Sequence, residues 1–134
     1  MRDVLVTAEK YLGLNETRDR SLLRIFLGID PKTTPWCAAF VNAVLKEEGI
    51  KGTGSNLARS FLRWGVPVEG TPELGDIIVF TRGDSSWQGH VGFVSGVDPN
   101  DDTRITVLGG NQSDKVCNVR YNTEHCLGIR REDV

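Results

Sequence analysis

The amino-acid sequence predicts one α+β domain in which N-terminal helices pack on a C-terminal antiparallel sheet of about five strands. Before Pro67, apolar residues recur at helical spacing. After it, short segments rich in β-branched residues alternate with turns. Helices followed by strands along the chain favour an antiparallel sheet covered by helices. The 134 residues contain no repeat or linker, so we interpret residues 1–134 as a single domain.

Four segments of the first half have the apolar spacing of helices. Glycines at the ends of three of them, Gly28, Gly49 and Gly65, are typical helix stops. Asn56 is a candidate N-cap for the fourth. The predicted helices are residues 2–12, 20–27, 35–48 and 56–64.

Five short segments of the second half are predicted as strands. The polar stretches 98–102 and 122–125 are predicted as turns between them. The acidic residues of the first turn lack the ligand spacing of an EF-hand, so we interpret it as a solvated turn. The predicted strands are residues 75–82, 90–97, 104–110, 115–121 and 126–131.

The bulk composition excludes several classes of function. A net charge of −2 gives no electrostatic case for nucleic acid or for an anionic membrane surface. The N-terminal MRDVLVTAEKYLGL is too charged for a signal peptide, and no apolar run reaches transmembrane length. We therefore expect a monomer that is made in the cytoplasm without a signal peptide, binds no nucleic acid and does not insert into membranes.

The three cysteines do not predict a disulfide framework or a metal site. Their number is odd, and none of them forms a C-x-x-C pair. A zinc site built from Cys117, His125 and Cys126 is disfavoured, because adjacent side chains diverge on a strand and a fourth ligand is missing. We expect no metal and no cofactor.

Cys37 lies in TTPWCAAFVNAVL, where a thiol begins an apolar helical run. Pro35 suits the first helical position, and Thr34 can cap the free amides. Unpaired N–H groups and the helix dipole in the first turn favour an anion, so this setting is expected to lower the pKa of the thiol. Cys37 is therefore a candidate nucleophile, although a buried core cysteine explains the position equally well.

His90 is the better of two candidate bases. His125 lies in a polar stretch between strands, where a histidine is usually exposed and idle. His90 begins the strand HVGFV directly after Gly89, and Gly92 keeps the same face of that strand open. A cysteine nucleophile paired with this histidine would need a third group to orient the ring.

Asn111 is the candidate for that third group. Antiparallel pairing of residues 90–97 with 104–111 places it beside His90, where its side-chain oxygen could accept a ring N–H. Gln112 is the alternative, or it points into the cleft toward a substrate. A shift of one residue in the strand register would present Gln112 or Gly110 in place of Asn111.

Four blocks of the sequence occur in the order PWCAAFVNAVL, GDIIVF, GHVGFVSGV and VLGGNQSD. Together they resemble the NlpC-like and CHAP (cysteine, histidine-dependent amidohydrolase/peptidase) families of peptidoglycan hydrolases. The resemblance covers roughly residues 30–131 and implies a papain-like fold. It also implies a nucleophile at Cys37, a base at His90 and a polar third residue at Asn111. Members hydrolyse amide bonds in the peptide stem, the crossbridge or the link between the stem and N-acetylmuramic acid.

The sequence departs from these families at two places. No glutamine precedes Cys37 to complete an oxyanion hole, so the second donor beside the Cys37 amide is unassigned. Many CHAP enzymes have a glutamate two residues before the asparagine, whereas this chain has Gly109 there.

Five residues near the catalytic candidates are predicted to contact substrate. Trp87 lies in the polar loop GDSSWQGH and is a candidate cleft wall. Asn56 and Arg59 could bind carboxylates of a peptide stem. Trp36 and Gln112 complete the set.

These features predict a peptidoglycan hydrolase with a Cys-His-Asn site. The interpretation that we favour is a phage endolysin that a holin releases to the cell wall in the periplasm. A tail-associated lysin and a type VI secretion amidase toxin with an immunity protein are alternatives. A catalytically inactive cell-wall-binding module is the alternative from another class.

Overall fold

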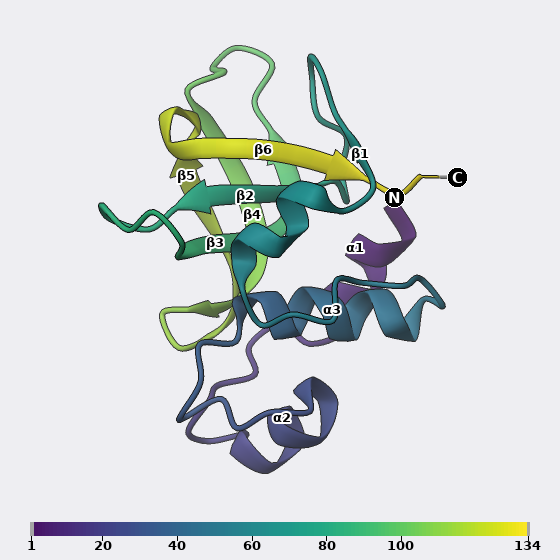
Figure 1. Cartoon of the computed structure of the whole chain (residues 1–134), viewed down its shortest axis with the longest axis vertical. Helices are drawn as coiled ribbons and strands as arrows, with labels where there is room; N and C mark the ends of the chain where they lie inside the picture. Colours follow the sequence, from purple (N-terminus) through teal and green to yellow (C-terminus); the bar gives the residue numbers. More distant parts are fainter. Residues whose placement is uncertain (1, 134) are drawn as a thin grey trace.

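Helices cover one face of an antiparallel sheet in the computed structural model, which describes residues 2–133 (Figure 1). The predicted α+β class is therefore confirmed. The helices are α1 (Arg2–Glu9), α2 (Arg20–Leu27), α3 (Cys37–Glu47) and the 3₁₀-helix η1 (Ala58–Arg63).

The sheet contains the five predicted strands and one very short addition. Its order is β1-β6-β2-β3-β4-β5, so the last strand returns to lie between β1 and β2. The two-residue strand β1 pairs with β6, and a 3₁₀ turn, η2 (Thr123–His125), connects β5 to β6. The strands are β1 (Val66–Pro67), β2 (Ile77–Thr81), β3 (Gly89–Val97), β4 (Arg104–Gln112), β5 (Lys115–Asn122) and β6 (Cys126–Arg131).

The bounds of α1 and α3 differ from the prediction. The α1 helix ends at Glu9 rather than at residue 12, and the chain turns until the Gly13 N–H bonds to the Val116 carbonyl, 2.8 Å away, at the sheet. The α3 helix begins at Cys37, with Trp36 as its N-cap residue and no capping side chain, so the predicted cap at Thr34 is wrong.

The fourth helix is a short 3₁₀-helix rather than an α-helix. It begins at Ala58 after Leu57 in the N-cap position, which leaves Asn56 outside the helix. Asn56 is therefore not an N-cap, and its exposed side chain is not committed to the helix.

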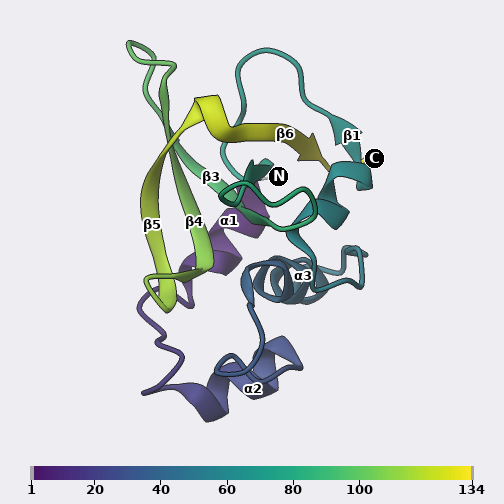
Figure 2. The ribbon, with the colours of Figure 1, turned by 60° about the vertical axis from the view of Figure 1, so that its left-hand side comes forward.

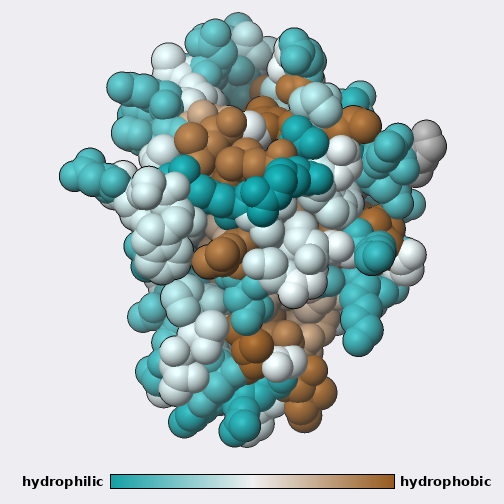
Figure 3. Space-filling model, in the orientation of Figure 1, coloured by the Kyte–Doolittle hydropathy of each residue, from teal (hydrophilic) through white to brown (hydrophobic). Residues whose placement is uncertain are grey.

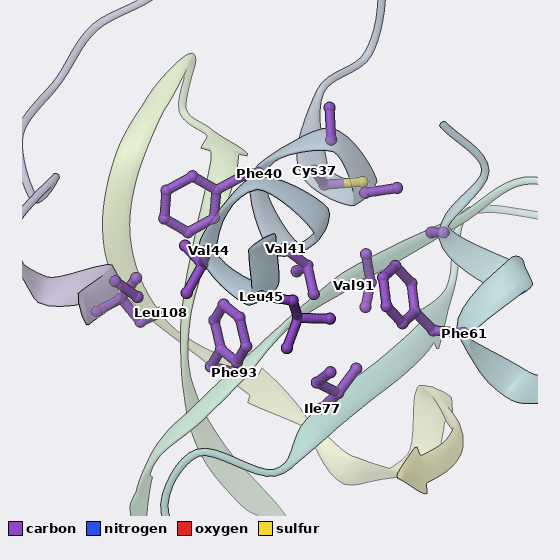
Figure 4. Packing of buried hydrophobic residues seen from close by; sticks show 14 of the residues in the cluster. Cys37, Phe40, Val41, Val44, Leu45, Phe61, Ile77, Val91, Phe93 and Leu108 are labelled. Carbon is purple, nitrogen blue, oxygen red and sulfur yellow. The ribbon is translucent and has the colours of Figure 1, made fainter. Parts of the chain in front are cut away.

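The core lies between α3 and the sheet (Figure 4). Phe40, Val41 and Leu45 of α3 are fully buried, as are Phe93 of β3 and Leu108 of β4. Burial of each such side chain contributes about 1.5–3 kcal/mol to folding. The α3 helix is thus fixed against the middle of the sheet, and Cys37 lies at its start.

The opposite face of the sheet carries a second, smaller apolar cluster. Ile78, Phe80, Val94, Ile105 and Val107 are buried there. The central strands are therefore apolar on both faces, which explains why they appear in the sequence as continuous apolar runs.

The free end of the β4–β5 hairpin lies beside the segment that joins α1 to α2 (Figure 2). Asn15 forms a β-bridge with Lys115, and the Val116 N–H donates to the Leu14 carbonyl, 2.9 Å away. Two residues with positive φ, Ser113 (52°) and Asp114 (61°), form the tight turn of this hairpin.

The surface has an apolar area at the lower end of the molecule, where α2 lies (Figure 3). Leu22 and Ile25 of α2 are 60% and 84% exposed. Within residues 2–133, no helix combines the length and apolar character needed to cross a bilayer.

Gly110 allows β4 to approach the start of α3. An added Cβ there would lie 2.6 Å from Cζ3 of Trp36 and 2.8 Å from Cβ of Phe40, both of which are fully buried. We expect Gly110→Ala to lower the free energy of unfolding by about 1–3 kcal/mol, because the core has no room for the methyl group. Urea denaturation measures this loss.

Gly96→Ala is the control, since its added Cβ would meet Thr106 at the looser distance of 3.1 Å. It should cost less stability than Gly110→Ala. Equal losses in the two variants would contradict the close packing of β4 on α3.

Candidate active site

Cys37 is the first residue of α3 and is only 4% exposed. Burial raises the pKa of its thiol, and the backbone N–H groups of Val91 and Ala38 and the positive charge of Arg82 offset part of that increase. The expectation that the helix start lowers the thiol pKa is therefore wrong. Loss of hydration disfavours the thiolate by more than the nearby amides and guanidinium stabilise it.

His90, in β3 directly before Val91, is half-buried. The pKa of its imidazole is lowered, chiefly by burial. The hydrogen bond to Gln112 opposes this decrease, and the positive charge of Arg82 adds to it. A raised thiol pKa and a lowered imidazole pKa together mean that both groups are neutral near pH 7. The resting site therefore holds a thiol and a neutral imidazole rather than an ion pair.

Gln112 holds the His90 ring, since its Oε1 lies 2.7 Å from His90 Nε2. The other end of the amide, Nε2, donates to the carbonyl oxygens of Cys117 (2.7 Å) and Val107 (3.3 Å). The Tyr121 hydroxyl donates to the same Oε1 at 3.1 Å. These partners fix which end of the amide faces the ring. His90 therefore carries its proton on Nε2 and leaves Nδ1 as an acceptor.

The prediction that Asn111 meets His90 is wrong in geometry, because β4 contains a bulge. The pairs Gly109↔Cys117 and Gln112↔Lys115 leave two residues of β4 opposite one residue of β5. Asn111 is one of the two and has a left-handed φ of 58°. The extra residue breaks the alternation of faces, so Gln112 takes the face that alternation would give to Asn111.

The register of β3 and β4 near the site is otherwise the predicted one. Phe93 pairs with Leu108, and Val94 pairs with Val107. The same register, extended along both strands, would place residue 111 opposite residue 90, as predicted. A second bulge, between Val94 and Gly96, shifts the pairing by one residue toward the 98–102 turn.

Gly109 makes room for the Gln112 amide. A Cβ at this position would lie 2.7 Å from Gln112 Oε1 and 3.5 Å from His90 Nε2. A side chain at residue 109 and the Gln112 amide would therefore compete for the same space beside the imidazole. This competition explains why the glycine and the glutamine occur together in this chain.

A pocket of about 290 Å³ lies beside Cys37. Its walls come from the segment before α3, the start of η1, and the loop between β2 and β3, where Trp87 is 60% exposed. The lining residues are Thr34, Pro35, Cys37, Asn56, Leu57, Ala58, Arg82, Trp87, Gln88 and Gly89.

Of the five predicted substrate contacts, Asn56 and Trp87 line this pocket. Trp36 does not, because its indole is fully buried and donates to Glu16 Oε1 at 3.1 Å. The Trp36 ring packs in the core, and its polar edge is satisfied inside the protein.

Arg59 and Gln112 also have internal roles in place of the predicted substrate contacts. Arg59 Nε donates to the Gln88 carbonyl (2.6 Å) and Nη2 to the Ser85 carbonyl (2.8 Å). It thereby ties the β2–β3 loop to η1. Gln112 is 3% exposed and holds His90.

Two residues near the site were missed in the sequence. Arg82 follows β2, and the pairing of Thr81 with Gly89 brings it beside the start of β3. The sequence signal for Arg82 is that GDIIVFTR and GHVGFVSGV form one hairpin, which places the end of the first segment beside the start of the second. Tyr121 stacks on Phe80 and lies 5.4 Å from the His90 ring centroid, a contact that the sequence gives no signal for.

The three cysteines are free thiols. In the described part of the chain, His, Cys, Asp and Glu side chains do not gather in groups of three or more that could hold a metal ion.

Comparison with known proteins identifies one family and one fold. The model of the CHAP domain family matches residues 29–111, more than half of the chain. A search of curated proteins finds no match.

Solved structures share the fold at low sequence identity. A NlpC/P60 family protein from Bacillus cereus is 21% identical, with a TM-score of 0.61 over 96% of this chain. The endolysin LysIME-EF1 is 16% identical, with a TM-score of 0.61 over 97% of this chain. A NLP/P60 family protein from Staphylococcus aureus, described as similar to a lipoprotein, is 20% identical, with a TM-score of 0.56 over 98% of this chain. The alignments cover 39%, 62% and 40% of those three proteins, in that order, so this chain matches only part of each.

The raised thiol pKa predicts how alkylation of Cys37 depends on pH. The thiolate forms only as the pH passes above the ordinary thiol value of 9.0, so labelling by iodoacetamide should still be increasing at that pH. Mass spectrometry of the peptide that contains Cys37 measures the rate, and free cysteine in solution is the control. A plateau reached below about pH 7 would instead show a thiolate–imidazolium pair.

Proposed function

Because this chain belongs to the CHAP domain family, we propose that it is a cysteine hydrolase that cleaves an amide bond in peptidoglycan. The observation that carries the proposal is a pocket with a thiol in its lining, followed along β3 by a histidine whose ring is held by a buried amide. Cys37 lines the pocket, His90 lies on the adjacent strand, and Gln112 fixes the tautomer of His90. This arrangement supports nucleophilic catalysis by a thiol.

In the proposed first step, the Cys37 sulfur attacks the carbonyl carbon of the scissile amide. The thiol proton moves to Nδ1 of His90 as the carbon–sulfur bond forms. His90 then gives that proton to the leaving amine as the carbon–nitrogen bond breaks, which leaves a thioester on Cys37. A water molecule, deprotonated by His90, hydrolyses the thioester and restores the thiol.

The neutral resting state suits this order of events. A buried thiol with a raised pKa keeps its proton until a substrate carbonyl is in place, and a neutral His90 is ready to accept it. The hydrogen bond from Nε2 to Gln112 stabilises the imidazolium that forms. Gln112 thus takes the role that the sequence prediction gave to Asn111.

The start of α3 supplies donors for the oxyanion. The Phe40 N–H bonds to the Trp36 carbonyl at 2.9 Å, so the amides of Cys37, Ala38 and Ala39 precede the first intrahelical bond. Amides at a helix start can stabilise the negative charge that develops on the substrate oxygen. This explains how the site can work without a glutamine before Cys37.

The substrate proposed is an amide in the peptide stem, in the crossbridge or at the muramoyl–peptide link. Trp87 and Asn56 would form its walls. For the setting, we propose a phage endolysin; a tail-associated lysin and a type VI secretion amidase toxin are the alternatives. A neighbouring holin gene would support the endolysin, and a neighbouring immunity gene would support the toxin.

Cys37→Ser tests the nucleophile. We expect loss of at least about 99% of peptidoglycan lysis with an unchanged melting temperature, because a serine hydroxyl ionises far less readily than a thiol. Turbidity of purified cell walls measures lysis, and mass spectrometry of the new end groups identifies the bond that is cut.

Cys126→Ser is the matched control and should retain wild-type lysis, since Cys126 lies at the start of β6 away from the pocket. Lysis by Cys37→Ser at more than a few per cent of wild type would remove Cys37 as nucleophile. Wall binding without lysis by the wild-type protein would favour the inactive binding module.

Gln112→Ala tests the orienting role. We expect kcat to fall by about ten- to a thousandfold with little change in KM, because the lost bond orients a catalytic group and does not bind substrate. Asn111→Ala is the matched control and should stay within a few-fold of wild type. A large kcat loss in Asn111→Ala, with Gln112→Ala near wild type, would contradict this assignment.

A further inference from the structure

Among the described residues, Arg82 is a cation without a partner at the mouth of the candidate active site. Its exposed side chain lines the same pocket as Cys37, Asn56 and Trp87. Within residues 2–133, the Arg82 guanidinium makes no hydrogen bond or ion pair. The ion pairs of the described residues include none between Arg82 and Asp84, two residues later.

Several other arginines of the chain are engaged by protein groups. Arg20 pairs with Asp30, Arg131 pairs with the buried Asp76, and Arg59 donates to two loop carbonyls. The contrast with Arg59 matters most, because both arginines flank the β2–β3 loop. Arg59 holds the loop in place, whereas the guanidinium of Arg82 remains available to a ligand.

The backbone that carries Arg82 is well fixed. The preceding residue, Thr81, is paired with Gly89, and Phe80 is paired with His90. The Arg59 hydrogen bonds hold the far side of the loop at Ser85 and Gln88. A side chain on such a rigid strand end can present its charge at a defined place beside the nucleophile.

Arg82 and Cys37 line the same pocket, so the guanidinium lies on the side of the pocket wall that a ligand of the thiol would meet. Its positive charge contributes to lowering the pKa of Cys37 and of His90, so it acts on the thiol and on the imidazole at once. An anionic group bound by Arg82 would therefore lie in the pocket that Cys37 lines.

We propose that Arg82 binds a free carboxylate of the substrate adjacent to the scissile amide, which makes the enzyme selective for anionic peptides. The inference rests on the proposed function of the pocket. A guanidinium matches a carboxylate with two parallel hydrogen bonds, which no neutral carboxamide can reproduce. The Asn56 side chain lines the same pocket and adds an amide donor.

The first test uses two small alkylating reagents and does not depend on peptidoglycan hydrolysis. Iodoacetate and iodoacetamide both alkylate a thiolate at their methylene carbon with loss of iodide, but only iodoacetate carries a carboxylate. The measured quantity is the ratio of their rates at Cys37, obtained by mass spectrometry of the peptide that contains it. Any change in the thiolate fraction affects both reagents equally and cancels in this ratio.

In Arg82→Gln, we expect the iodoacetate to iodoacetamide ratio at Cys37 to fall by about three- to tenfold. Arg63→Gln is the matched control, since Arg63 is also exposed but lies on η1 outside the pocket, and its ratio should equal that of wild type. The ratio at Cys126 in the same digests should not change in either variant. An unchanged ratio at Cys37 in Arg82→Gln would overturn the proposal.

The second test uses a pair of synthetic stem peptides that differ only in a carboxylate or a carboxamide beside the scissile amide. Arg82→Gln should raise KM for the carboxylate peptide by about tenfold and leave KM for the carboxamide peptide within about twofold. Equal effects on both peptides would overturn the carboxylate site. If wild type cuts neither peptide nor purified walls, the proposed function fails, and the alkylation ratio still decides whether Arg82 binds a carboxylate.

Discussion

The close approach of β4 to the start of α3 at Gly110 is the contact on which the candidate site depends. Because Gly110 has no side chain, the Trp36 ring packs directly against the strand. Trp36 immediately precedes Cys37, and Gln112 follows Gly110 by two residues. A single packing contact therefore sets the relative position of the segment that carries the thiol and the segment that orients the imidazole. The bond from Trp36 to Glu16 extends this support to the chain between α1 and α2.

Burial has opposite effects on the pKa values of the two central groups, and both effects favour the neutral state. It raises the pKa of Cys37 and lowers that of His90. A site of this kind does not store a preformed thiolate, so in the proposed mechanism the thiol gives its proton to His90 only as the sulfur attacks the substrate. The backbone amides around the sulfur then serve the transition state more than the resting state.

Much of the fold could be predicted from the sequence because its local signals agree with the tertiary structure. Apolar spacing and turn residues predicted the bounds of α2 and the presence of the five main strands. They also placed Cys37 near a helix start and His90 near a strand start. Gln112 could not be chosen over Asn111, because strand alternation does not reveal a bulge. The prediction that Arg59 and Trp36 contact substrate differs from the structure because the sequence does not show which polar groups find partners inside the protein.

The polar contacts at both ends of the Gln112 amide have a consequence for how this site can vary. Its Nε2 faces two carbonyl oxygens, and its Oε1 accepts from His90 and Tyr121. A carboxylate in its place would turn one negatively charged oxygen toward those carbonyls, where repulsion would replace two hydrogen bonds. An exchange of amide for acid would therefore require a rearrangement of β5 as well as a new residue on β4. The identity of the third residue is thus set by the strand behind it as much as by the histidine in front.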